Sequence, residues 1–189
     1  MRSLEAIMLH IARLAIMEVF LGKPLIDREE LIREYPQLAE KQAVFVTLNK
    51  QEGGRTSLRG CIGSIIPYRS LIDDIIYNAR AAAFEDPRFP PLKEEELEHI
   101  KIEISLLTIP RALSYSDTED LRRKIVPGKY GVILKFGGRQ ATFLPQVWEQ
   151  LPEFDLFFQQ LCLKAGLPGN CLKWHPEIDV YEVKKFEEP

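Results

Sequence analysis

Two pairs of adjacent glycines, each between two apolar runs, constrain the fold of this chain more than any other feature. Gly53–Gly54 separates AVFVTL (43–48) from SLRGCIGSI (57–65), and Gly137–Gly138 divides the stretch GVILKFGGRQATFL (131–144). Glycine readily adopts the positive φ angles that tight hairpin turns require. The two patterns therefore predict two β-hairpins, and strands joined by hairpins form antiparallel sheets.

The remaining periodic segments predict helices and single strands. Apolar residues spaced three and four positions apart indicate an amphipathic helix, and strict alternation of apolar and polar residues indicates a half-buried strand. By these patterns we expect helices over 4–21, 69–84 and 153–165, and strands over 100–106 and 179–186. The last strand carries charges that are typical of a sheet edge. Helices between groups of hairpin strands predict an α+β fold, with a mainly antiparallel sheet flanked by helices.

Length and charge limit the classes of protein to consider. The 189 residues suit one domain over 1–189, with room for a large and a small lobe. The net charge of −3 argues against a general nucleic-acid binder, because such proteins usually carry a positive excess. The basic run 122–124 follows the acidic pair 119–120, which is typical of a mixed solvated surface. No window approaches the ~20 uninterrupted apolar residues of a membrane span, so we expect a soluble, cytoplasmic protein.

Three cysteines, Cys61, Cys162 and Cys171, are too few and too irregularly spaced to indicate a disulfide framework. We therefore expect three reduced thiols, as in a cytosolic protein. The spacing from Cys162 to Cys171 matches no zinc pattern, and the chain has only three histidines. The sequence predicts no metal site, and it contains no common phosphate-binding loop that would indicate a nucleotide cofactor.

The segment 57–65 places an arginine and a cysteine two positions apart. Because side chains alternate along a strand, Leu58 and Ile62 are predicted to face the core. Arg59 and Cys61 then share the opposite face, and Gly63 leaves space beside them. A nearby guanidinium favours the thiolate, which is the nucleophilic form of cysteine. The pattern makes Cys61 a candidate catalytic nucleophile and Arg59 a candidate ligand-binding residue.

Structural explanations compete with this functional interpretation. Free cysteine is among the most buried residue types and often acts as a small hydrophobe. Gly60 and Gly63 weaken a strand, so each needs a reason: either a ligand approaches the backbone closely, or a neighbouring helix does. Catalysis also needs a general base within reach of the thiol. Nothing in the sequence places a histidine near Cys61.

Two further segments contribute candidate ligand-binding residues. In DPRFPPL (86–92), Arg88 can bind an anion, while Asp86 either orients that anion or fixes the loop through a salt bridge, and Phe89 fills the core. Where a predicted strand meets a helix start, Gln146 can present its amide to a ligand near the positive helix end. It can equally satisfy backbone groups of the turn.

Six blocks occur in order along the chain: LRGCIG, DPRFPPL, IEISLLT, PGKYGVIL, TFLPQV and LCLKAGL. Together they resemble the AMMECR domain family, named after the Alport syndrome, midface hypoplasia and elliptocytosis chromosomal region. The resemblance runs from about residue 4 to the C-terminus. The length resembles that of the prokaryotic members.

The resemblance implies a two-lobed α+β fold with an antiparallel sheet flanked by helices. It also implies that the signature block, here residues 58–63, lies in a cleft-like region and forms the functional site. The family has no established reaction. Its prokaryotic members are often encoded with, or fused to, a Memo-like protein and a radical SAM enzyme, which implies a shared pathway and physical partners.

Three classes of function follow. The first is a protein that binds a small molecule or anion, or an enzyme, with a site around the LRGCIG block. The second is a non-catalytic adaptor or accessory subunit for a Memo-like protein and a radical SAM enzyme. The third, nucleic-acid binding, has the least support in the charge pattern.

Overall fold

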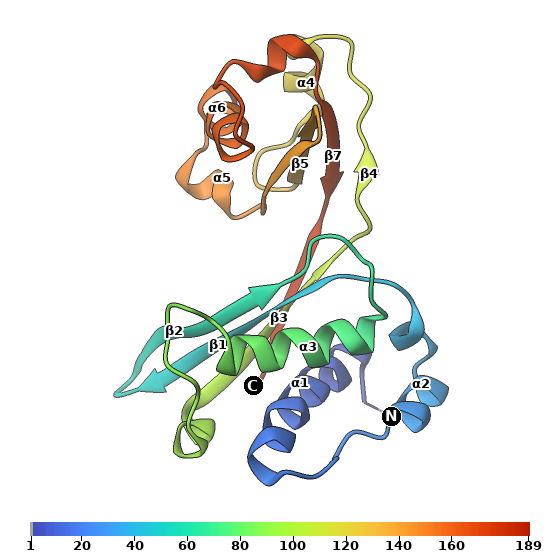
Figure 1. The fold of residues 1–189 in the computed structure, drawn as a ribbon, viewed down its shortest axis with the longest axis vertical. Coiled ribbons are helices and arrows are strands. Elements are labelled where there is room, and N and C mark those ends of the chain that lie inside the picture. The colour runs from blue at the N-terminus through green and yellow to red at the C-terminus, as the bar shows by residue number, and fades with distance from the viewer. Residues whose placement is uncertain (1) are drawn as a thin grey trace. The chain divides into compact units, whose positions relative to one another are not determined.

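The computed structural model describes residues 2–189, which form two compact units (Figure 1). Unit 1 contains the chain up to Leu107 together with the C-terminal segment 184–189, and unit 2 contains 108–183. Each unit has its own sheet and its own core. The architecture is α+β with antiparallel sheets, as the sequence predicts, but the strands divide between two sheets.

The sheet of unit 1 has the strand order β2-β1-β3-β8. Its strands are β1 (Val44–Glu52), β2 (Arg55–Gly63), β3 (Ile100–Leu107) and β8 (Val183–Glu187). Strand β1 pairs antiparallel with both β2 and β3. Gly53 and Gly54 adopt φ angles of 58° and 76° between β1 and β2, so the first predicted hairpin is confirmed.

Helices α1 (Leu4–Leu21) and α3 (Leu71–Phe84) pack on each other and cover one face of this sheet (Figure 1). The Ser3 side chain accepts a hydrogen bond from the backbone of α1, and Gly22 ends that helix with φ 63°. Alternate residues of the strands, such as Val46 and Ile102, are fully buried beneath the helices. The opposite face of the sheet is less covered, and the candidate site lies partly on it.

Three short helices complete unit 1: α2 (Arg28–Glu34), η1 (Pro36–Ala39) and η2 (Glu94–His99). Between α3 and η2 the chain passes through the proline-rich segment 86–92, which forms no helix or strand. Its irregular backbone follows from its prolines, which lack an N–H and disfavour helical geometry in the residue before them.

The sheet of unit 2 has the strand order β4-β7-β5-β6. Its strands are β4 (Arg111–Ala112), β5 (Gly131–Phe136), β6 (Arg139–Phe143) and β7 (Glu177–Tyr181). Helices α4 (Thr118–Lys124), α5 (Val147–Gln150), α6 (Phe154–Lys164) and η3 (Cys171–Trp174) complete the unit. Gly137 and Gly138 turn β5 into β6 with φ angles of 57° and 77°, which confirms the second predicted hairpin.

Two sequence predictions need correction here. The segment 179–186, expected as one edge strand, contributes to two strands that separate at Glu182. Strand β7 pairs with β5 and β4 inside the sheet of unit 2, whereas β8 lies at the edge of the other sheet. Helix α4 is not predicted, because its charged sequence indicates only a solvated surface. Asp117 stabilises the start of this helix by accepting the backbone N–H of Asp120.

The prediction of three reduced thiols is wrong, because Cys162 and Cys171 form a disulfide. The chain turns back after α6 at Gly166, which has φ 75°, and this turn brings the two Cα atoms to 5.8 Å. That separation lies within the range that a disulfide requires. Only Cys61 is a free thiol, and the cysteine count no longer supports a reducing compartment. Within residues 2–189, no helix is long and apolar enough to cross a membrane.

Candidate functional site

A β-bulge in β2 decides where the residues of the LRGCIG block point. Cys61 pairs with Thr47, Gly60 with Leu48 and Leu58 with Asn49, so Arg59 has no partner in the register. An extra residue in one strand breaks the regular alternation of faces and re-aims its side chain. The bulge therefore shifts every residue that precedes it in β2 to the other face.

The predicted orientation of this segment is correspondingly wrong for two residues. Leu58, expected in the core, is 41% exposed, while Arg59, expected on the open face, is only 7% exposed. Cys61 is half-buried and lies opposite Thr47 on the sheet face that α1 and α3 leave uncovered. Arg59 and Cys61 therefore do not share an open face.

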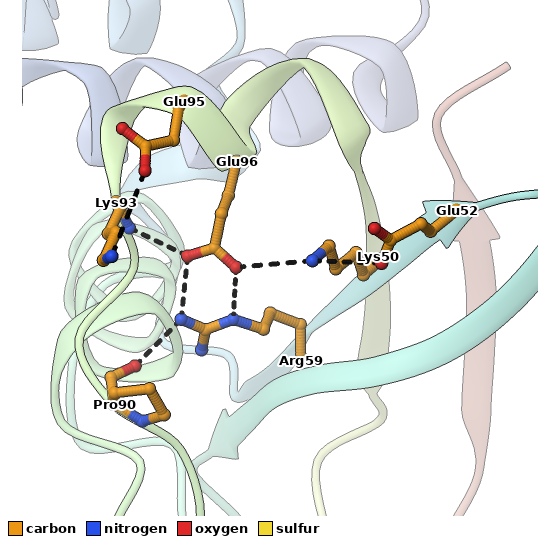
Figure 2. Close-up of polar contacts among 7 residues, drawn as sticks. All are labelled: Lys50, Glu52, Arg59, Pro90, Lys93, Glu95 and Glu96. Carbon is orange, nitrogen blue, oxygen red and sulfur yellow. Dashed lines mark hydrogen bonds and ion pairs between the residues drawn. The ribbon is translucent and has the colours of Figure 1, made fainter.

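The buried guanidinium of Arg59 forms a two-point ion pair with Glu96, as Figure 2 shows. Nε lies 2.9 Å from Oε1 of Glu96 and Nη2 lies 3.0 Å from Oε2. Nη2 also donates to the backbone oxygen of Pro90 at 2.9 Å. The hydrogen bonds from Arg59 hold the pKa of Glu96 below its usual value, against the opposing effect of burial. The positive charge of Arg59 is thus paired with a carboxylate of the same protein.

The third nitrogen of this guanidinium, Nη1, is buried and has no hydrogen-bond partner. The ring of Phe89 lies near it, with its centroid 5.8 Å from Cζ of Arg59 and 5.5 Å from Cζ of Arg88. An aromatic face attracts a cation and offsets part of the cost of burying it. Together, Glu96, Pro90 and Phe89 make Arg59 a clamp that holds β2 against the segment 86–96.

Both glycines of the block are explained by close packing within unit 1. A Cβ atom on Gly60 would lie 2.1 Å from the backbone oxygen of Ala82 in α3. A Cβ atom on Gly63 would lie 2.1 Å from the ring of Phe45. The space expected beside Gly63 is therefore filled by protein. Of the two explanations left open by the sequence, the structure supports close approach by neighbouring elements.

Asp86 joins Cys61 to Arg88. Its carboxylate is 4% exposed; Oδ2 accepts the backbone N–H of Cys61 at 2.9 Å and Nη2 of Arg88 at 2.8 Å. Oδ1 accepts the backbone N–H and Nε of Arg88 at 3.1 and 3.0 Å. The hydrogen bonds from the Arg88 side chain hold the pKa of Asp86 well below its usual range. The interpretation of Asp86 as a salt-bridged residue that fixes its loop is confirmed.

The guanidinium that lies beside Cys61 is that of Arg88. Its Nη2 is 3.4 Å from the backbone oxygen of Cys61, and its side chain is 54% exposed. The pKa of Arg88 is raised, mainly by hydrogen bonding to Asp86 and to a smaller degree by Coulombic attraction to Cys61. The hydroxyl of Thr47 donates to Sγ of Cys61 at 3.3 Å. We call Thr47, Cys61 and Arg88 the Cys61–Arg88 surface.

A known protein family matches most of the chain. The model of the AMMECR1 family matches residues 9–186. This chain belongs to the AMMECR1 family. Its relatives include Protein MK0488 of Methanopyrus kandleri, 41% identical in an alignment of length 161 that covers 80% of this chain and 74% of that protein. A protein of Aquifex aeolicus is 37% identical in an alignment of length 191, gaps included, that covers 96% of this chain and 92% of the relative.

Among solved structures, the chain is similar to the crystal structure of uncharacterized protein PH0010 from Pyrococcus horikoshii. The TM-score is 0.79 at 34% identity, over 97% of this chain and 91% of that one. The AMMECR1 relatives and this solved structure thus support the same fold. The names of these proteins state no activity.

The remaining candidate of this AMMECR1 chain, Gln146, is exposed at the N-terminus of the four-residue helix α5 in unit 2. Its side chain makes no capping hydrogen bond. The cluster described above consists of unit 1 residues only, and two of them, Thr47 and Glu96, were not singled out from the sequence. Thr47 follows from pairing β1 with β2, but only the fold selects Glu96 from the three consecutive glutamates 94–96.

Within residues 2–189, histidine, cysteine and acidic side chains form no group of three suited to a metal ion.

Proposed function

We propose that this protein binds a small anionic molecule at the Cys61–Arg88 surface. The observation that carries the proposal is the buried carboxylate of Asp86, which holds the backbone of Cys61 and the guanidinium of Arg88 at once. An arginine whose position is fixed in advance loses little side-chain entropy on binding. Because half of this side chain remains exposed, its free N–H groups are accessible to oxygen atoms of a carboxylate or phosphate.

Other residues of the LRGCIG block hold in place the segments that form this surface. The Arg59 clamp fixes the segment that carries Asp86 and Arg88, and Gly60 lets α3 approach β2 closely. The hydroxyl of Thr47 contacts the thiol of Cys61, and the guanidinium of Arg88 contacts the backbone oxygen of the same residue. In this account Arg59 positions the site, Arg88 binds the anion and Cys61 lies beside it.

The contacts of Cys61 favour binding over catalysis. Its hydrogen bonds run to Thr47, Asp86 and Arg88. Asp86 accepts from the backbone N–H and not from the thiol, and the hydroxyl of Thr47 donates to the sulfur. None of these contacts supplies a general base for the thiol, which nucleophilic catalysis needs. A binding function requires no such base.

Protection of Cys61 from alkylation tests the proposal. Inorganic phosphate serves as the anion, and the rate of reaction with neutral iodoacetamide is measured with increasing phosphate at constant ionic strength. We expect saturable protection of the wild type, and little protection of Arg88→Gln. Arg55→Gln is a matched control, because Arg55 is exposed in the same strand but lies outside the surface. Equal protection of all three proteins, or of none, would overturn the proposal.

An exposed leucine favours a second function, that of an accessory subunit. Leu58 lies on the same sheet face as Cys61 and is 41% exposed, and an exposed large apolar side chain can contribute to the apolar core of a protein interface. We propose a Memo-like protein, in a pathway with a radical SAM enzyme, as the partner. Leu58→Asp should reduce retention of the Memo-like protein in a pulldown, whereas Cys61→Ala should not. Failure of the wild type to retain either protein at micromolar concentration contradicts this second function.

A further inference from the structure

Unit 1 also contains a groove that is lined by residues outside the LRGCIG block. Its volume is about 960 Å³, and it extends along one face of α3. Ser70, Asp73, Ile76, Tyr77 and Arg80 contribute to its wall. Their spacing of three and four residues places them on one side of the helix. Glu18, in the last turn of α1, and residues 24, 26 and 28 also line it.

Three arginines line this groove, and each is paired with a carboxylate. Arg28 lies 2.7 Å from Asp73, Arg69 lies 3.0 Å from Asp74, and Arg80 lies 2.5 Å from Glu18. In every pair the arginine is the more exposed partner; the side chain of Arg80, for example, is 43% exposed and that of Glu18 only 12%. Asp74 and Glu18 are largely buried, whereas Asp73 is 38% exposed. The formal charges of the three pairs balance, and the more accessible member of each pair is the positive one.

Two tyrosines add flat apolar surface to these charges. The guanidinium of Arg69 lies between their rings, with Cζ 3.8 Å from the centroid of Tyr77 and 4.6 Å from that of Tyr68. About half of each tyrosine is exposed. Ile26 and Ile76 supply an aliphatic part of the lining. The groove thus combines cationic groups with aromatic and aliphatic surfaces, and its volume lies in the range of small-molecule sites, roughly 300–1,000 Å³.

We propose that this groove is a second ligand site, which binds a small organic anion that carries a flat ring, of the nucleotide type. The phosphate oxygens are bound by the outward N–H groups of Arg28, Arg69 and Arg80, because guanidinium groups match phosphate geometry. The ring packs against the exposed surfaces of Tyr68 and Tyr77. Glu85 also lines the groove and disfavours a high ligand charge, which makes nucleoside mono- and diphosphates the best match.

Fluorescence titration with N-methylanthraniloyl-ADP tests this site, with unlabelled ADP, adenosine and inorganic phosphate as competitors. We expect saturable binding of the probe that ADP reverses, with adenosine and phosphate each at least about tenfold less effective. Arg28→Gln should weaken binding about tenfold or more, because it removes one charge-assisted contact. Arg33→Gln is the matched control: it makes the same change on the same helix, at an exposed position outside the groove.

Tyr77→Ala provides a second test at an exposed side chain, which should lower affinity for ADP while the thermal midpoint stays close to that of the wild type. The proposal is overturned by three results: no saturation up to about 1 mM probe, wild-type affinity in both Arg28→Gln and Tyr77→Ala, or competition by phosphate alone that equals competition by ADP. Arg88→Gln should keep the ADP-reversible binding that Arg28→Gln weakens, which separates this groove from the Cys61–Arg88 surface.

Discussion

The guanidinium of Arg59 illustrates how burial assigns roles to individual residues. A buried positive charge must be paired, because desolvation of an unpaired ion costs several kcal/mol. Glu96 supplies the pair, and Pro90 supplies a backbone acceptor. Arg88, already a candidate anion-binding residue from the sequence, keeps half of its side chain exposed to solvent. The exposed arginine is therefore the one available to a ligand.

Removing Glu96 should destabilise unit 1. In Glu96→Ala the buried guanidinium loses its counter-ion, and we expect the free energy of unfolding to fall by about 3 kcal/mol. Urea unfolding followed by circular dichroism measures the change. Glu95→Ala is the control, because the Glu95 side chain is 79% exposed and should contribute less than about 0.5 kcal/mol to the free energy of unfolding. Equal effects of the two variants would refute the clamp.

Asp86 should make stability depend on pH. Its pKa in the folded protein is depressed, chiefly by hydrogen bonding to Arg88, so its contribution is complete above the unfolded pKa of about 4 and declines as pH falls below that value. Asp86→Asn should therefore cost about 2 kcal/mol at pH 7 and progressively less near pH 3. Parallel urea titrations of the two proteins measure this difference, and other carboxylates cancel in the comparison. A difference that is independent of pH would contradict the assigned role.

At the scale of elements, hairpins could be predicted from the sequence and the bulge could not. A Gly-Gly turn is a local signal, because positive φ angles limit which residues fit. The bulge at Arg59 depends on what lies beside the strand: α3 behind Gly60 and the carboxylate of Glu96. Alternation alone assigns Leu58 and Arg59 to the wrong faces for this reason. The ion pair Arg59–Glu96 joins residues 37 positions apart, which no local pattern indicates.

The disulfide between α6 and η3 should stabilise unit 2. Nine positions separate the two cysteines, and closing a loop of about this length contributes about 2–3 kcal/mol. Both tryptophans, Trp148 and Trp174, belong to unit 2, so their fluorescence reports its unfolding. The double variant Cys162→Ala/Cys171→Ala should shift this transition to lower urea, and Cys61→Ala should not. Three titratable thiols in the unreduced, denatured protein would contradict the disulfide.

At the scale of the molecule, the sequence predicts the class of fold but not the division of strands between sheets. The α+β class follows from hairpins and amphipathic helices, and the family resemblance, which the AMMECR1 match now confirms, adds two lobes. The separation of β7 from β8 at Glu182 depends on long-range pairing with β5 and β3, so composition and alternation cannot reveal it. Gln146 belongs to unit 2, whereas the other candidate residues belong to unit 1.

The fold brings together two of the candidate residues proposed from the sequence, but their contacts differ from those that the sequence suggests. Cys61 and Arg88 come from two separate sequence blocks and lie side by side in the fold. The buried carboxylate of Asp86 connects them, and this contact is not evident from the sequence. Arg59, Gly60 and Gly63 act in packing and positioning. Side-chain burial and the bulge decide these roles, and both depend on the complete fold.

Charge-selective alkylation of Cys61 tests the central claim most directly, that Arg88 makes the surface beside this thiol attractive to anions. The measurement is the ratio of rate constants for anionic iodoacetate and neutral iodoacetamide at low salt, and Cys61 is the single free cysteine. We predict a ratio about fivefold higher in the wild type than in Arg88→Gln, with Arg55→Gln unchanged, because an exposed cation that contacts the backbone of the same residue contributes about 1 kcal/mol. An identical ratio in the wild type and Arg88→Gln would contradict the account.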